Sequence, residues 1–130
     1  MKNKFLETGE HGYHPLRKFK IILSGLRFAV LYDFSVMYKI VVSVAILIPV
    51  LIFNAWIDAS LIILSTGVML TAELFNTAIE AICDFMETRY NEKIRIIKDI
   101  AAAATGIAIF VWLTVLTLEV IEVFRPFLHL

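Results

Sequence analysis

The sequence is short of charge and of cysteine, and each shortage excludes a class of protein. Charged residues make up 18% of the 130 residues, and 12 basic residues balance 12 acidic ones. This zero balance excludes a generally basic nucleic-acid-binding protein, so no nucleic-acid partner is expected. The single cysteine, Cys83, excludes an intrachain disulfide and a zinc cluster built from cysteines.

Glycine is also scarce, and its distribution excludes the common phosphate-binding loops. The five glycines form neither a Walker A loop nor the glycine-rich loop of protein kinases. The HExxH pattern of zinc proteases and the GxSxG pattern of serine hydrolases are absent as well. If the chain binds ATP, it does so without a soluble nucleotide-binding fold.

Apolar residues dominate what is present. Hydrophobic residues make up 60% of the chain, well above the roughly 45–50% of a soluble domain. Three runs carry no charge: Ile40–Ile57, Ala59–Ala72 and Ile100–Leu118. Since roughly 20 helical residues cross a hydrocarbon core about 30 Å thick, we predict an all-α integral membrane protein. A single domain over residues 1–130 would contain transmembrane helices at about 36–57, 59–87 and 97–122.

An amphipathic segment, residues 15–31, precedes the first apolar run. Basic residues alternate there with apolar residues at helical spacing, which are Leu16, Phe19, Ile22, Leu23, Leu26 and Val30. Pro15 suits the first turn of a helix. We expect this helix to lie on the membrane surface, with its basic side chains near anionic headgroups.

Basic residues predict the orientation in the membrane. Seven precede the first apolar run, Ile40–Ile57: Lys2, Lys4, Arg17, Lys18, Lys20, Arg27 and Lys39. Four lie between the second and third spans: Arg89, Lys93, Arg95 and Lys98. The positive-inside rule then predicts a cytoplasmic N-terminus and a cytoplasmic second loop. Glu119 and Glu122, near the outer end of the third span, are expected to face headgroups.

A row of polar residues interrupts the second span. Glu73, Asn76, Glu80 and Asp84 fall within an arc of about 80° when each residue turns a helix by about 100°. If the helix enters the membrane near Ala59, Glu73 lies about 21 Å along it, inside the hydrocarbon, while Asp84 reaches the opposite surface. A carboxylate at that depth indicates a functional site, and the alternative is a stripe of hydrogen bonds that holds helices together.

The loop after this polar stripe supplies complementary charge. Lys98 and Asp99 open the third span, and Arg89, Lys93 and Arg95 lie just before them. Carboxylates that bind Mg²⁺, beside basic groups that bind phosphate, are the electrostatic set used in phosphoryl transfer.

One family carries the same motif. The run from Ala72 to Asp84 reads A-E-L-F-N-T-A-I-E-A-I-C-D, and Lys98-Asp99-Ile100-Ala101-Ala102 follows. This pattern resembles the signature of the small prokaryotic diacylglycerol kinases, a family that also includes undecaprenol kinases. The resemblance covers nearly the whole chain, from Gly25-Leu26-Arg27 through all three spans.

The resemblance implies a role for each matching residue. Glu73 would act as the general base on the lipid hydroxyl, and Arg27 and Glu73 would contact the lipid substrate. Glu80 and Asp33 would bind Mg²⁺, although Asp33 stands where the family has a longer glutamate. The remaining nucleotide contacts would be Asn76, Asp84, Tyr90, Lys98 and Asp99.

The same resemblance implies the partners and location. The substrates would be ATP, with Mg²⁺, and a membrane lipid alcohol. The chain would form a homotrimer with shared active sites in the bacterial inner membrane, with those sites on the cytoplasmic side.

Several functions compete at this point. The leading hypothesis is the ATP-dependent phosphorylation of diacylglycerol to phosphatidic acid, and a sister hypothesis changes the acceptor to undecaprenol. A transporter or proton relay would instead use the polar stripe to line a pathway. A trimeric membrane scaffold without activity is the third class.

Overall fold

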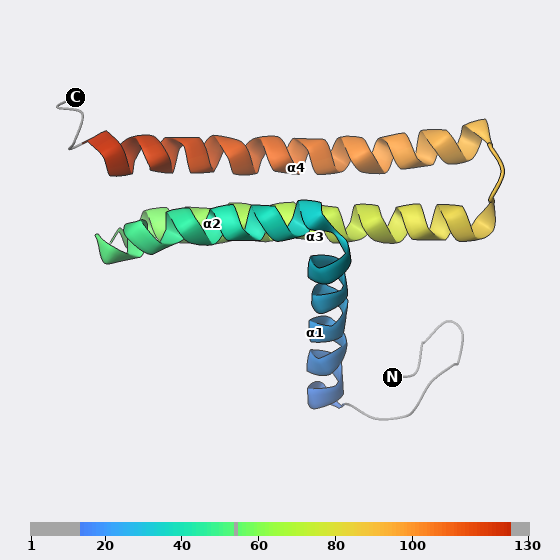
Figure 1. The fold of residues 1–130 in the computed structure, drawn as a ribbon, viewed down its shortest axis with the longest axis horizontal. Helices are drawn as coiled ribbons and strands as arrows, with labels where there is room; N and C mark the ends of the chain where they lie inside the picture. Colours follow the sequence, from blue (N-terminus) through green and yellow to red (C-terminus); the bar gives the residue numbers. More distant parts are fainter. Residues whose placement is uncertain (1–13, 54, 126–130) are drawn as a thin grey trace. The chain divides into compact units, whose positions relative to one another are not determined.

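The computed structural model describes residues 14–53 and 55–125, and every regular element in these ranges is an α-helix. The helices are α1 (Pro15–Tyr32), α2 (Phe34–Ile52), α3 (Trp56–Met86) and α4 (Glu92–Phe124) (Figure 1). No strand occurs in the described part of the chain, so the predicted all-α fold is confirmed. Lys2 and Lys4, which contribute to the predicted orientation, lie outside the described residues.

The chain divides into two compact units, residues 1–34 and 35–130, each described here by itself. In the first unit, α1 begins with Pro15 at its first turn and ends where Asp33 becomes extended. The Asp33 amide donates to the Ala29 carbonyl at 2.9 Å, which closes the last turn. The predicted helix is therefore present, and its location on a membrane surface stays a prediction.

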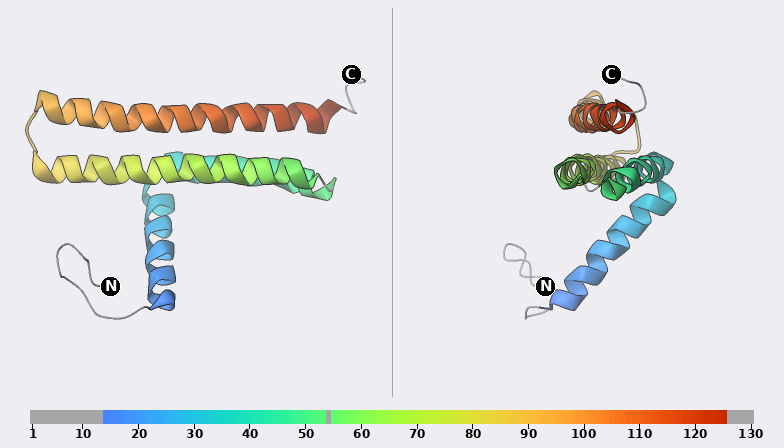
Figure 2. Two further views of the ribbon diagram at one scale, coloured as in Figure 1. Left: turned by 180° about the vertical axis from the view of Figure 1, so that it is seen from behind. Right: turned by 90° about the vertical axis from the view of Figure 1, so that its left-hand side faces the viewer.

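The second unit contains three helices that are long and apolar enough to cross a membrane. Figures 1 and 2 show α3 and α4 side by side and antiparallel, joined by a short turn. A chain with three such helices is an integral membrane protein.

Two helix ends differ from the expected bounds. The first span ends at Ile52 and not near residue 57, where the Phe53 amide donates to the Pro49 carbonyl at 3.0 Å. The Ala55 amide reaches back to the Val50 carbonyl at 3.2 Å and reverses the chain there. The third span begins at Glu92 and not near residue 97, because the Asn91 side chain accepts from the Lys93 amide at 3.0 Å and caps the helix.

The core of the second unit is small and apolar. Its buried members come from all three helices: Val50, Ala59, Ile62, Met69, Trp112 and Leu116. Many other large apolar side chains point outward, including Ile57, Phe75 and Phe110. This distribution suits a chain surrounded by lipid, because acyl tails solvate the outward-facing side chains.

A polar cluster lies within this apolar core. The Ser43 hydroxyl accepts from the Trp112 indole N–H at 2.9 Å and from the Thr66 hydroxyl at 3.0 Å. Ser43 itself donates to the Lys39 carbonyl at 2.9 Å. Because an unpaired polar group in hydrocarbon is costly, these bonds hold α2, α3 and α4 in one register.

Candidate active site

Glu73 lies in the middle of α3 and is buried. It follows the first residue of the helix by 17 positions, or about 26 Å along the axis. Only 6% of its surface is exposed. Beside it, the Thr105 hydroxyl of α4 donates to the Ala72 carbonyl at 3.2 Å, which ties the two helices together at this level. The predicted depth of Glu73 therefore corresponds to a buried site between helices.

Lys39 of α2 forms an ion pair with Glu73, and the sequence did not reveal it. Its ammonium group donates to Glu73 Oε1 and, at 2.7 Å, to the Ser35 hydroxyl. Lys39 is 2% exposed. Lys39 was expected among the basic residues that precede the apolar run Ile40–Ile57, and it lies instead within α2, which buries it in the bundle. A lone lysine near an apolar run and a lone glutamate in the next run were the available signal.

This pairing explains how a carboxylate is kept within a membrane span. Burying a single charge costs several kcal/mol even after local relaxation, and a buried partner of opposite sign offsets that cost. The Lys39 ammonium supplies the opposite charge, and Ser35 satisfies a second of its three donors.

Asn76 and Glu80 lie one turn apart on the exposed side of Glu73. The Asn76 amide nitrogen donates to Glu80 Oε1 at 2.9 Å. Since an ionised carboxylate only accepts hydrogen bonds, this contact fixes which amide atom is nitrogen. The Asn76 carbonyl oxygen is left buried and without a partner, the one such side-chain atom in the described part of the chain. A free amide oxygen beside an exposed carboxylate is a set of hard oxygen donors.

These donors fit Mg²⁺, which binds oxygen and usually takes one or two carboxylates together with phosphate and water. Within residues 14–53 and 55–125, no group of three or more acidic, histidine or cysteine side chains is arranged to hold a metal ion. One chain therefore offers Glu80 and Asn76, and a bound nucleotide would have to supply further oxygens.

Lys98 and Asp84 join the end of α3 to the start of α4. Lys98 Nζ lies 2.5 Å from Asp84 Oδ1, and both side chains are at least partly exposed. Exposed ion pairs contribute only about 0–1 kcal/mol, so an incoming phosphate can compete for this lysine at little cost.

The first two turns of α4 contain a second ionic network, which Tyr90 joins from the loop before the helix. Arg95 contacts Glu92 at 2.5 Å and Asp99 at 2.9 Å, and the Tyr90 hydroxyl donates to Glu92 at 2.5 Å. Tyr90 and Asp99, two of the predicted nucleotide contacts, are thus exposed at the same end of the bundle as Lys98.

Two predicted site residues belong to the first unit. Arg27 is exposed on α1, and Asp33 is half-buried at the end of that helix. The remaining predicted residues lie on α3, on α4 or in the turn between them. There the structure brings together Asn76 with Glu80 and Asp84 with Lys98, while Glu73 pairs with Lys39.

The fold and the site define an α-helical integral membrane protein with a carboxylate buried in its second long helix and hard oxygen donors at the exposed end of that helix. A family model for prokaryotic diacylglycerol kinase matches residues 20–120. The chain therefore belongs to the prokaryotic diacylglycerol kinase family and is a membrane lipid kinase of that type. No curated protein and no solved structure matches the chain.

Proposed function

We propose that this protein transfers the γ-phosphate of ATP to diacylglycerol and forms phosphatidic acid. The observation that carries the proposal is Glu73, a buried carboxylate in a membrane span of a chain that belongs to a lipid kinase family. A lipid hydroxyl reaches this depth from the bilayer, whereas ATP reaches the exposed end of the polar stripe from water.

Glu73 acts as the general base. The lipid hydroxyl oxygen attacks the γ-phosphorus, the bond from that phosphorus to the bridging oxygen breaks, and ADP leaves. The hydroxyl proton passes to the Glu73 carboxylate. Lys39 is a positioning residue, because its ammonium group holds Glu73 Oε1 in place inside the bundle. General bases of this kind typically contribute about 10²–10⁴ in rate.

The exposed residues bind the nucleotide. Glu80 and the free Asn76 oxygen would hold Mg²⁺, with Asp33 as a further ligand. When bound, Mg²⁺ neutralises charge that develops on the phosphate oxygens. Lys98 exchanges Asp84 for a phosphate, and Tyr90 and Asp99 contact the rest of the nucleotide. Arg27 contacts the lipid.

A second acceptor, undecaprenol, is the alternative that the family includes. Purified protein given radiolabelled ATP and either diacylglycerol or undecaprenol separates the two. We expect label on diacylglycerol, with at most slow labelling of undecaprenol. Faster labelling of undecaprenol would show that undecaprenol, and not diacylglycerol, is the acceptor. Label on neither lipid would contradict the kinase proposal.

We further propose a homotrimer with shared sites in the bacterial inner membrane, with the N-terminus and the active site in the cytoplasm. Four basic residues, Arg89, Lys93, Arg95 and Lys98, flank the turn at the site end of the bundle, which supports a cytoplasmic location. An apolar groove of about 690 Å³ between α3 and α4, lined by Gly67, Ala104 and Ala108 among others, allows close approach of another helix and supports self-association.

A further inference from the structure

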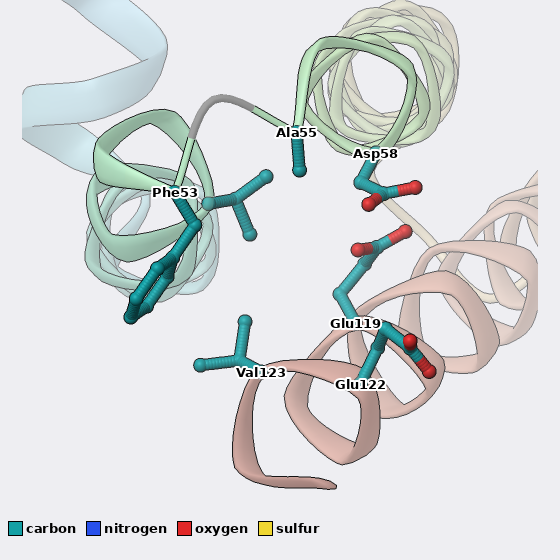
Figure 3. A pocket seen from close by; sticks show the side chains of 7 residues that line it. Phe53, Ala55, Asp58, Glu119, Glu122 and Val123 are labelled. Atoms are coloured by element: carbon teal, nitrogen blue, oxygen red, sulfur yellow. The ribbon is translucent and has the colours of Figure 1, made fainter. Parts of the chain in front are cut away.

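A second acidic site lies at the opposite end of the bundle. There α2 ends, α3 begins and α4 ends around a pocket of about 310 Å³ (Figure 3). Asp58 comes from α3, and Glu119 and Glu122 come from α4. Asp58 is 15 residues from Glu73, or about 22 Å along α3, so this pocket is separate from the candidate active site.

Glu119 lies in this pocket, and 6% of its residue surface is exposed. Within residues 14–53 and 55–125, its carboxylate has no hydrogen-bond or ion-pair partner. Figure 3 shows its carboxylate directed into the pocket and toward that of Asp58. That Glu119 faces headgroups stays a prediction; α4 turns its side chain toward the ends of α2 and α3.

The other charged side chains that line the pocket, Asp58 and Glu122, are both acidic. Glu122 is exposed and has its own partner, since Arg125 lies 3.3 Å from it. Glu73 offers the contrast, since an equally buried carboxylate there has the Lys39 ammonium beside it. Among the described residues that line this pocket, every charged side chain is acidic and none is basic, which points to a cationic ligand.

The size and the walls of the pocket select the kind of cation. No group of three or more metal-ligating side chains in the described ranges is arranged for a metal ion. The volume is about ten times the roughly 30 Å³ that one water molecule occupies. Val50, Phe53 and Val123 supply apolar walls around the carboxylates. An organic cation with a short aliphatic stem fits both features.

We propose that this pocket binds a primary ammonium group, with Glu119 and Asp58 as its acceptors and the apolar walls against its stem. An ammonium group has three N–H donors and carboxylates are its strongest acceptors. Because the pocket lies where three membrane helices end, the ammonium group can come from an aminophospholipid headgroup or from a soluble amine. The site does not depend on the phosphoryl-transfer site.

Native mass spectrometry of the full protein tests the proposal. The protein is released from nanodiscs that contain equal amounts of phosphatidylethanolamine and phosphatidylcholine, which differ in the methylation of the ammonium group. Wild type should retain phosphatidylethanolamine preferentially. Glu119→Gln should lower that preference roughly tenfold, the effect expected when one charge-assisted hydrogen bond is lost. Glu87→Gln, at the opposite end of the bundle, is the control and should retain the preference.

A second arm separates the two sources. Ethanolamine is titrated onto protein in pure phosphatidylcholine nanodiscs, and binding is followed as a rise in the unfolding temperature. If ethanolamine stabilises wild type saturably, Glu119→Gln abolishes that effect, and the first arm shows no lipid preference, the ligand of the pocket is a soluble amine. If Glu119→Gln does not fold, Asp58→Asn takes its place. Equal lipid retention and equal stabilisation in wild type and variant would overturn the proposal.

Discussion

At the scale of single residues, Lys39 and Glu73 form a buried pair of opposite charge within a membrane protein. Each charge offsets the free-energy cost of burying the other. Removing one partner of such a pair costs about 3–5 kcal/mol, whereas replacing both with neutral groups costs far less. The pair therefore has a structural consequence that can be separated from its consequence for catalysis.

Lys39→Met should destabilise the protein by about 3–5 kcal/mol, because Glu73 is left buried without a cation. The double variant Lys39→Met/Glu73→Gln should recover most of that stability and should not recover phosphoryl transfer. Unfolding in mixed detergent micelles measures the first effect, and a transfer assay measures the second. Additive losses of stability in the double variant would contradict the pairing.

Lys98→Met should weaken ATP binding about tenfold, since a phosphate contact is lost. Folding should change by less than about 1 kcal/mol, because the ion pair with Asp84 is exposed. Lys93→Met is the control, because Lys93 is an exposed lysine in the first turn of α4, on the same helix as Lys98. Equal nucleotide affinity in the two variants would remove Lys98 from the phosphate site.

At the scale of helices, the polar cluster around Ser43 fixes how α2, α3 and α4 meet. Trp112→Phe should cost about 1 kcal/mol, because it removes the indole N–H that bonds Ser43 and also some buried surface. Trp56, the other tryptophan, is exposed, so Trp56→Phe should lower the free energy of unfolding only slightly. Unfolding midpoints compare the two variants, and equal midpoints would show that the cluster contributes nothing.

Much of each helix could be predicted from the sequence. Uncharged runs predicted three spans, and the angular positions of the four stripe residues predicted one face of α3. The end of α2 at Ile52 could not be predicted, because nothing in the apolar pattern changes there. The pairing of Ser43 with Trp112, 69 residues apart, also depends on tertiary packing.

The part of the candidate site that lies on one helix could be predicted from the sequence. The contacts that join residues of different helices could not. The stripe on α3 follows from helical spacing, as does the depth of Glu73. The positions of Lys39 and Glu119 inside the bundle could not be predicted. A charged residue near the end of an apolar run is usually interpreted as a membrane anchor, because the sequence does not show toward which helix its side chain points. Contacts between helices decide the direction of both side chains.

At the scale of the whole molecule, one chain provides few oxygen donors for a metal, and the proposed trimer shares its sites between subunits. Variants Asp33→Asn and Glu73→Gln should each be inactive. If the two residues act from different subunits, mixed trimers assembled from both variants should regain part of the wild-type activity. Mixed trimers that stay as inactive as either variant alone would contradict sites that combine these two residues across subunits.

Glu73→Gln provides the most direct test of the central claim, that a buried carboxylate takes the proton of a lipid alcohol. Transfer to diacylglycerol and equilibrium binding of MgATP are measured side by side, with Glu87→Gln, at the residue that follows α3, as the control. The account predicts that Glu73→Gln lowers the rate of transfer by about 10²–10⁴-fold and leaves MgATP affinity within about twofold of wild type. The control should match wild type in both measurements. Wild-type turnover in Glu73→Gln would contradict the account.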